Sequence, residues 1–290
     1  MEDRRKELKQ AEKGSWISLI AYLIISAGKL LAGYLLHSAA LVADGYNNLS
    51  DSINSIAMIV GLRYAQKPAD ANHRYGHWKG ETVATLAMSF MILYIGIQVT
   101  LTAIKQVLNP SNQQPSLMTA TVAGLSALIM LGVYWYNQRL AKRVHSDGLA
   151  AAAKDNLADM LTSLATMLAV IASKAGWSWA DPVMAVIVGL IILKTGLEIF
   201  VESVFVLTDG FPEDELMMYR EEILKVRGVL AVKSIRGRSY GGRPSLDVTI
   251  LVDPSLTIVQ AHDISDQVEE FLDDLFAIHS ADIHVEPMDV

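Results

Sequence analysis

Long apolar stretches occupy the chain as far as residue 207. Two of them, residues 82–104 and 116–138, contain no charged residue. Four more, at about residues 14–36, 39–64, 148–173 and 179–205, have a similar length but include ionisable residues. A helix needs about 20 residues to cross the ~30 Å hydrocarbon core of a bilayer. The pattern therefore predicts an α-helical membrane protein with six transmembrane helices.

The pattern changes to shorter elements after Gly210. Residues 211–226 and 256–276 have the apolar spacing of amphipathic helices, whereas residues 229–240 and 245–253 alternate as strands do. A last short strand is predicted at 281–287. The order αββαβ predicts a small α+β domain with two helices on one face of a sheet, which dimerisation would help to stabilise.

These patterns divide the chain into three predicted parts. Residues 1–13 are a mixed-charge cytosolic lead, too polar for a signal peptide. Residues 14–207 form the six-span membrane domain, and residues 208–290 form the cytosolic α+β domain.

Composition supports a membrane protein and limits its chemistry. Apolar residues make up 52% of the chain and charged residues only 19%, with a mean hydropathy of +0.31, which disfavours a soluble enzyme. The chain has no cysteine, so disulfides, thiolate zinc sites and cysteine nucleophiles are excluded. Any metal ion must therefore bind to oxygen or imidazole ligands.

Charge is distributed unevenly along the chain. The net charge is −7, and residues 208–290 contain 17 acidic and 7 basic residues. Neither part has a basic footprint, which excludes nucleic acid as an expected partner. Lysine and arginine gather before the first span, between the second and third, and between the fourth and fifth, which predicts cytosolic N and C termini. A bacterial plasma membrane fits this topology, and an organelle membrane stays open.

Polar residues inside the predicted spans point to a cation site. One side of the second span has four of them at i, i+3, i+4 and i+7: Asp44, Asn47, Asn48 and Asp51. The fifth span repeats the i,i+4 spacing with Asp155 and Asp159. Each charged carboxylate at a helix centre costs about 2.5–3.5 kcal/mol on insertion. We expect Asn47, Asp51, Asp155 and Asp159 to surround a divalent cation, with Asp44 and Asn48 as supporting neighbours.

Two other interpretations of these carboxylates are weaker. They could pair with Lys29 or Lys154 as structural ion pairs, but Lys154 is the immediate neighbour of Asp155 and points elsewhere on the helix. They could also belong to an intramembrane aspartyl protease, but the YD and GxGD signatures of that class are absent.

The same segments resemble the cation diffusion facilitator family of divalent-metal/proton antiporters. The resemblance covers nearly the whole chain and is carried by SAALVADGYNNLSD, PADANHRYGH, DNLAD, LTDGFPED, VQAHDISDQVEE and IHVEP. It implies a homodimer of six-span protomers, a transport site between spans two and five, and a ferredoxin-like cytosolic domain that binds regulatory metal. It is not an enzyme family.

The ligand set departs from that of zinc-transporting members, whose transport site includes a histidine. Here all four predicted ligands supply oxygen, which suits Mn²⁺ better than imidazole does, and the sequence resembles the manganese-exporting branch. Efflux of Zn²⁺, Fe²⁺ or Cd²⁺ is the alternative, followed by a metal-sensing membrane protein without transport. Coupling to protons would then depend on the clustered carboxylates, within an alternating-access cycle.

Three further groups of residues complete the predictions. Asp70, His73 and His77 lie in one loop with the histidines at i,i+4, a metal-binding spacing that the resemblance supports, although helix capping would also explain it. In the tail the resemblance implies a weakened metal site at Asp247, His262, His284 and Glu286. It also implies a salt bridge between Lys79 and Asp209 at the dimer interface.

Overall fold

The computed structural model describes residues 2–35, 39–108, 117–177, 180–240, 242–276, 278 and 280–288. The chain divides into two compact units, residues 1–203 and 204–290. Each unit has its own core and is described separately.

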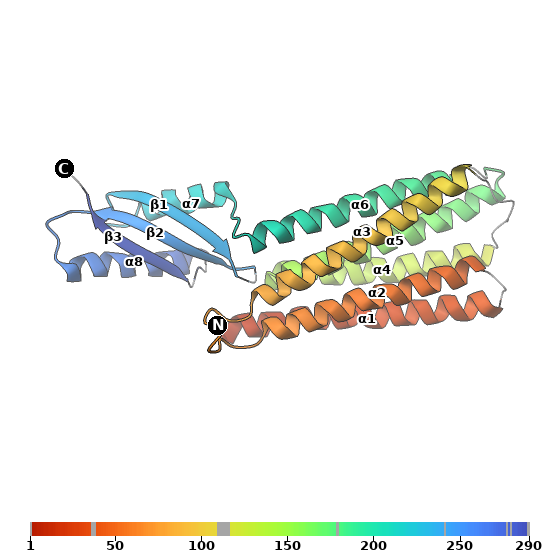
Figure 1. The fold of residues 1–290 in the computed structure, drawn as a ribbon, viewed down its shortest axis with the longest axis horizontal. Helices are drawn as coiled ribbons and strands as arrows, with labels where there is room; N and C mark the ends of the chain where they lie inside the picture. Colours follow the sequence, from red (N-terminus) through yellow and green to blue (C-terminus); the bar gives the residue numbers. More distant parts are fainter. Residues whose placement is uncertain are drawn as a thin grey trace. The chain divides into compact units, whose positions relative to one another are not determined.

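Six long helices account for most of the described residues up to Leu207, as the apolar pattern predicts. They are α1 (Glu2–Leu35), α2 (Ala39–Ala65), α3 (Lys79–Leu108), α4 (Leu117–Val144), α5 (Asp147–Lys174) and α6 (Ala180–Leu207), and they run side by side in Figure 1. Helix α1 is continuous from Glu2, so the predicted lead and the first span form one helix.

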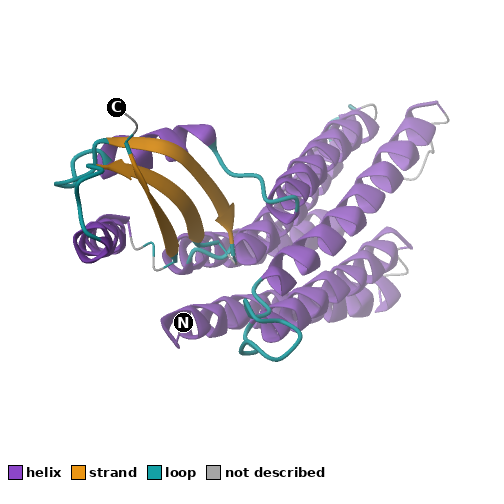
Figure 2. Ribbon diagram, turned by 60° about the vertical axis from the view of Figure 1, so that its left-hand side comes forward, coloured by secondary structure: helices purple, strands orange, loops and turns teal. Residues whose placement is uncertain are grey.

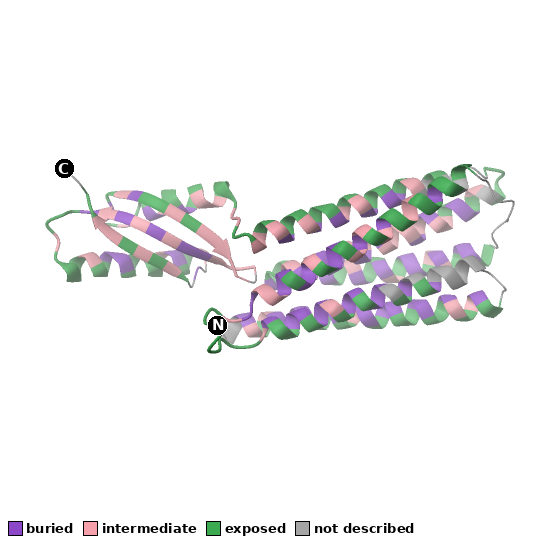
Figure 3. Cartoon of the chain, in the orientation of Figure 1, coloured by how far each residue is buried: buried purple, intermediate pink, exposed green. Residues whose placement is uncertain are grey.

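Four of these helices are long and apolar enough to cross a membrane when only the described residues are considered. The qualifying segments are Arg4–Leu35, Lys79–Lys105, Leu117–Val144 and Asp147–Ala172. Large apolar side chains such as Ile24, Val60, Tyr94 and Leu128 are exposed, and buried and exposed positions alternate along the helices in Figure 3. Such an apolar surface is unfavourable in contact with water and favourable in contact with lipid.

Helix α1 packs against three other helices, α2, α4 and α5, and α2 also packs against α3 and α5. Small residues allow the closest approach, because a methyl group added at Gly61 of α2 would lie 2.2 Å from the Cβ atom of Ala84 in α3. Ala158 of α5 shares an apolar cluster with Ile92 of α3 and Ile192 of α6. Helices α1, α2 and α5 therefore converge, which brings their polar residues together.

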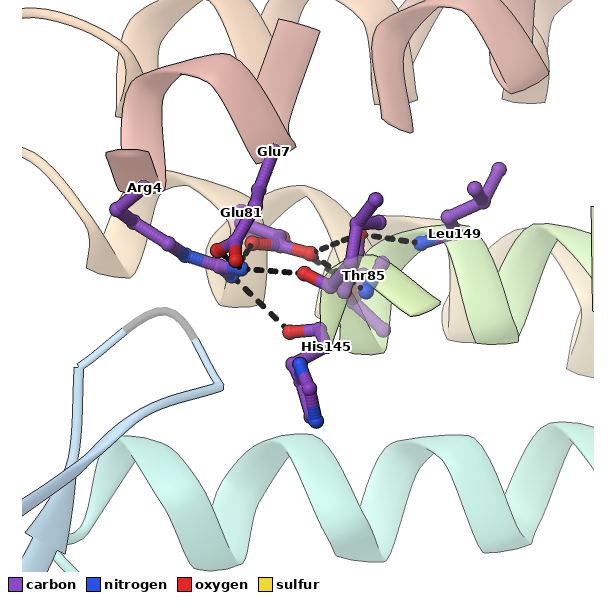
Figure 4. Close-up of polar contacts among 9 residues, drawn as sticks. Arg4, Glu7, Glu81, Thr85, His145 and Leu149 are labelled. Atoms are coloured by element: carbon purple, nitrogen blue, oxygen red, sulfur yellow. Dashed lines mark hydrogen bonds and ion pairs between the residues drawn. The ribbon is translucent and has the colours of Figure 1, made fainter. Parts of the chain in front are cut away.

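A buried ion pair ties the start of α1 to the start of α3 (Figure 4). Arg4 is 4% exposed and Glu81 is 1% exposed, and the guanidinium Nη2 lies 3.3 Å from the Glu81 carboxylate. Arg4 also donates hydrogen bonds to the carbonyl oxygens of Val144 (2.6 Å) and His145 (3.1 Å) in the α4–α5 turn. Glu81 accepts a hydrogen bond from Ser146. This network of charge-assisted hydrogen bonds anchors three segments at one end of the bundle.

The second unit has the predicted order αββαβ (Figure 2). Its elements are α7 (Glu213–Ile223), β1 (Ala231–Ser239), β2 (Pro244–Val252), α8 (Ile258–Phe276) and β3 (Ala281–Pro287). Strand β2 is central, antiparallel to β1 and parallel to β3. Alternate residues of β2, including Val248 and Ile250, are buried with residues of both helices. Both helices therefore cover one face of the sheet, and the other face presents polar residues.

Candidate metal transport site

Three of the four predicted ligands lie on α2 and α5 close enough for their charges to interact. Among the described residues, their oxygens are not gathered as closely as the ligand atoms of Asp70, His73 and His77. Asp51 is 1% exposed, Asp155 is 6% exposed, and Asp159 is half-buried. The negative charge of each carboxylate acts on the other two. We call Asp51, Asp155 and Asp159 the carboxylate cluster. Three like charges in a buried position strongly favour the approach of a cation.

The fourth predicted ligand, Asn47, belongs to α2, but its side chain lies outside the described residues. The same holds for the side chain of Asp44. Asn48, the other predicted supporting residue, is described and buried, and its side-chain amide Nδ2 lies 3.3 Å from Asp51 Oδ2. Asn48 therefore contacts a predicted ligand directly.

The other two carboxylates also accept hydrogen bonds from buried side chains. The hydroxyl group of Tyr22 in α1 donates to Asp159. Asn54 of α2 donates to Asp155 over 3.4 Å, which connects α2 to α5. The amide oxygen of Asn54 is buried and has no hydrogen-bond partner among the described residues, so it adds an oxygen acceptor beside Asp155.

The spacing of the predicted ligands does not point to Tyr22 or Asn54, although the sequence contains a signal for Tyr22. Polar residues recur along one face of α1 within an apolar segment, and all are buried: Ser15, Ser18, Tyr22, Ser26 and Lys29. A polar stripe on a transmembrane helix points to the interior of the bundle. Asn54 extends the stripe of α2 by three residues beyond Asp51 and follows the same rule.

The two lysines considered as structural partners of the carboxylate cluster have other described contacts. Lys29 is 1% exposed and its Nζ atom lies 2.6 Å from the Asn48 amide oxygen. Lys154 forms an ion pair with Glu202 over 3.2 Å at an exposed position. Among the described residues, the charge of Lys29 acts on Asp51, one of three carboxylates. A metal ion or protons could balance the negative charge that remains.

A second predicted group, the loop triad of Asp70, His73 and His77, forms a compact cluster between α2 and α3. The potential ligand atoms of the three side chains all lie within 4.8 Å of one another. His73 Nδ1 lies 3.2 Å from Asp70 Oδ1, and His77 Nε2 lies 3.4 Å from Asp70 Oδ2. The triad has the residue types and the spacing of a site for a divalent cation.

Local bonds orient the loop triad. His77 Nδ1 lies 3.0 Å from the carbonyl oxygen of Pro68, which can only accept a hydrogen bond, so Nδ1 has the hydrogen. This leaves Nε2, on the side of Asp70, as the atom that the neutral imidazole can offer to a metal ion. The backbone N–H of His73 donates to Asp70 and, together with that of Asn72, lowers the pKa of the Asp70 carboxyl group. Asp70 is therefore held ionised as a ligand must be.

The four predicted residues of the cytosolic-domain site do not form one cluster within a single copy of the domain. Asp247 and His284 lie on strands, on the sheet face opposite the buried residues of β2. His262 lies on α8, which covers the other face. His262 and Glu286 line a cavity of about 460 Å³ at the end of β3.

Basic residues already contact two of these four. Arg238 holds both carboxylate oxygens of Asp247 at 3.0 Å. Lys233 lies 2.5 Å from Glu286, and its hydrogen bond lowers the pKa of that carboxyl group. A cation would have to displace these partners, which agrees with a weakened site.

Lys79 and Asp209 belong to different compact units. Lys79 is the first residue of α3. Asp209 follows α6 with a positive φ of 59°, in a turn where the Gly210 N–H donates to the Phe205 carbonyl oxygen over 2.8 Å. Their salt bridge stays a prediction.

Comparison with known proteins gives the family. Residues 15–208 match the cation efflux transmembrane domain, and residues 211–288 match the cytoplasmic domain of cation efflux proteins. The manganese efflux system proteins MneS and MneP of Bacillus subtilis are 41% and 31% identical to the chain, each match covering 99% of both proteins. The cation-efflux pump FieF of Shewanella oneidensis is 27% identical over 97% of this chain and 96% of its own length. The chain therefore belongs to the cation efflux, or cation diffusion facilitator, family: it is a multi-pass membrane transporter of metal cations with a cytoplasmic C-terminal domain, and not an enzyme.

Proposed function

We propose that this transporter exports Mn²⁺ from the cytosol in exchange for protons. The observation that carries the proposal is the carboxylate cluster, in which Asp51, Asp155 and Asp159 present only oxygen donors inside the bundle. Asn47 is the proposed fourth ligand, and its amide would also offer oxygen. Carboxylate and carbonyl oxygens suit Mn²⁺, whereas sites that select zinc usually include imidazole or thiolate.

The relatives support manganese as the substrate. MneS and MneP are both named as manganese efflux proteins, and both match over nearly their full length. FieF is named only as a cation-efflux pump. Oxygen ligands alone do not reject Zn²⁺ or Fe²⁺, whose intrinsic affinities exceed that of Mn²⁺. Export of those ions, or of Cd²⁺, by the same mechanism is the alternative.

Protons and metal would compete for the same carboxylates. Without a cation the three charges repel one another at a buried position, and either a bound metal or added protons relieve that repulsion. If the bundle exposes the cluster alternately to the two sides of the membrane, inward proton movement drives metal outward. The lysine and arginine pattern favours cytosolic N and C termini, and the bacterial relatives favour the plasma membrane.

We further propose that the protein acts as a homodimer with additional metal sites. The match to the cytoplasmic domain of cation efflux proteins supports dimerisation through residues 211–288. The loop triad is proposed to bind a divalent cation outside the transport path. The proposed pairing of Lys79 with Asp209 would lock the dimer interface, and non-additive losses in a double-mutant cycle would support it.

Flux measurements in proteoliposomes test the proposed function. Purified full-length protein is reconstituted with an imposed pH gradient, and uptake of Mn²⁺, Zn²⁺, Fe²⁺ and Cd²⁺ is followed separately. We expect Mn²⁺ flux that depends on the gradient and is lost in Asp51→Asn. Faster flux of Zn²⁺ or Fe²⁺ would identify that ion, and not Mn²⁺, as the substrate. Metal binding without any flux would indicate a metal-sensing protein.

A further inference from the structure

Helix α1 directs a buried polar face toward the carboxylate cluster without contributing any predicted ligand. Ser15, Ser18, Tyr22, Ser26 and Lys29 are each exposed by 2% or less. Their spacing of three or four residues places them along one side of the helix. Helix α1 packs against both α2 and α5, the two helices that supply the predicted ligands. Polar side chains inside a membrane are energetically costly, and those that occur there usually have a function.

Tyr22 is oriented toward Asp159 by its own partners. Asn156 Nδ2 lies 3.1 Å from the Tyr22 hydroxyl oxygen and donates to it, so that oxygen acts as an acceptor on this side. The hydroxyl hydrogen is then directed to the carboxylates of α5, where it is donated to Asp159 and where Asp155 is also within hydrogen-bonding reach. This hydrogen bond is accepted by Oδ2, one of the two oxygens of the Asp159 carboxylate.

Asn156 cannot rotate without breaking other bonds. Its side-chain oxygen accepts hydrogen bonds from Ser18 of α1 over 3.1 Å and from Asn137 of α4 over 3.0 Å. Asn137 also donates to Ser18 over 2.8 Å. The hydroxyl of Tyr22 is therefore the end of a network that connects three helices and fixes the amide of Asn156 in one orientation.

Lys29 orients a second chain of bonds toward Asp51. The ammonium group has only donors, so the atom of Asn48 that it contacts over 2.6 Å is the amide oxygen. The amide nitrogen of Asn48 must then face the other way, toward Asp51 Oδ2 at 3.3 Å. Lys29 thereby fixes the orientation of Asn48 and places a positive charge next to Asp51.

We propose that Tyr22 and Lys29 are positioning residues for metal binding, Tyr22 for Asp159 and Lys29, through Asn48, for Asp51. The proposal rests on the proposed function and adds two residues that bind no metal themselves. In each series of bonds a hydrogen bond holds the ligating carboxylate, which limits the orientations in which that carboxylate can meet the ion. Hydrogen bonds to ligating carboxylates commonly change metal affinity or activity by about 10- to 100-fold.

The first test removes the Tyr22 hydroxyl group, and with it the hydrogen bonds to Asp159 and Asn156, with little change of shape. Full-length Tyr22→Phe is reconstituted and its Mn²⁺ flux is measured over a range of concentrations. We expect KM to rise by about 10- to 100-fold, with a smaller change in kcat. Tyr34→Phe is the matched control, because it deletes a hydroxyl group from an exposed position of the same helix, where it contacts the Tyr46 hydroxyl. That control should keep the KM of the unmodified protein.

The second test separates positioning from packing at Lys29. Lys29→Met should raise KM as Tyr22→Phe does, and Lys29→Arg, which retains the charge and the donors, should recover most of the loss. Lys29→Gln makes the same comparison if Lys29→Met does not insert into the membrane. Because Lys29 acts through Asn48, Lys29→Met should add little to the defect of Asn48→Ala.

The outcomes distinguish this inference from the proposed function. If the unmodified protein moves no Mn²⁺, the proposed function fails. If it transports Mn²⁺ and the KM of Tyr22→Phe equals that of Tyr34→Phe, only the positioning role is overturned. Equal defects in Lys29→Met and Lys29→Arg, or losses that add to those of Asn48→Ala, would overturn the role of Lys29.

Discussion

The carboxylate cluster and the loop triad both gather metal-binding side chains, but different parts of the fold hold them in place. In the cluster each carboxylate is held by a side chain of the bundle, as Tyr22 of α1 holds Asp159 of α5. In the loop triad Asp70 is held by backbone N–H groups two and three residues further along the chain. The cluster therefore depends on how helices pack, whereas the triad depends on one local turn.

The two regions also differ in burial and in ligand type. Asp51 and Asp155 are buried, whereas the side chains of Asp70 and His73 are about half exposed. The cluster presents oxygen donors, and the triad adds two imidazoles. A buried site with several carboxylates favours exchange of protons for metal, while a more exposed site can bind metal in equilibrium with water. This contrast suits transport in the first region and accessory binding in the second.

The largest expected effect follows from removing charge within the cluster. Asp51→Asn, Asp155→Asn and Asp159→Asn preserve the side-chain shape but remove a carboxylate ligand. We expect Mn²⁺ flux to fall by at least about 100-fold in each, consistent with loss of a charged metal ligand. Proteoliposome flux measures this, with the exposed cytosolic substitution Asp253→Asn as the control. Near-normal flux in any two cluster variants would show that the site lies elsewhere.

The next prediction changes the ligand type in the cluster toward that of the triad. Asp155→His or Asn47→His introduces a borderline nitrogen donor, which favours Zn²⁺ over Mn²⁺. We expect the ratio of Zn²⁺ to Mn²⁺ flux to rise by about tenfold, equivalent to about 1.4 kcal/mol. Competition between the two ions in the same vesicles measures this ratio. An unchanged ratio in both variants would place selectivity outside these positions.

A smaller effect is expected from removing one ligand of the loop triad. His77→Ala removes one ligand and the bond to Pro68. We expect the bound metal per protomer to fall by about one ion, with Mn²⁺ flux reduced only several-fold, because the triad is separate from the cluster. Elemental analysis of the dialysed protein gives the stoichiometry, and Arg74→Ala in the same loop is the control. A loss of flux as severe as in Asp155→Asn would remove the distinction between the two regions.

The smallest expected effect concerns the pH dependence of the loop. Hydrogen bonds from the backbone of His73 and Asn72 lower the pKa of Asp70 below its usual value. The ionised form therefore stabilises the folded loop above the unfolded pKa of about 3.9, and this stabilisation is lost as pH falls through the lower folded value. Exchange of the His73 amide hydrogen should stay protected from pH 7 to 5. Asp70→Asn should weaken that protection throughout the range, and equal protection in both proteins would contradict the prediction.

The helices and the ligand types could be predicted from the sequence, because both depend on local pattern. Apolar stretches long enough to span a bilayer indicate α1–α6, and alternation in the tail indicates β1–β3. The i,i+4 spacing of Asp155 and Asp159 places them on one face of any helix. The turn containing Asp70 and His73 closes through bonds between neighbouring residues, so its ligands were also visible as a sequence motif.

Only the tertiary structure decided which side chains support those ligands. Tyr22 and Asp159 are 137 residues apart, and Arg4 and Glu81 are 77 apart. Such pairs depend on the rotation and depth of packed helices, which a one-dimensional pattern does not contain. The separation of His262 from His284 also depends on tertiary packing. Helix α8, which contains His262, packs its apolar face on one side of the sheet, whereas the alternation of side chains along β3 points His284 to the other side.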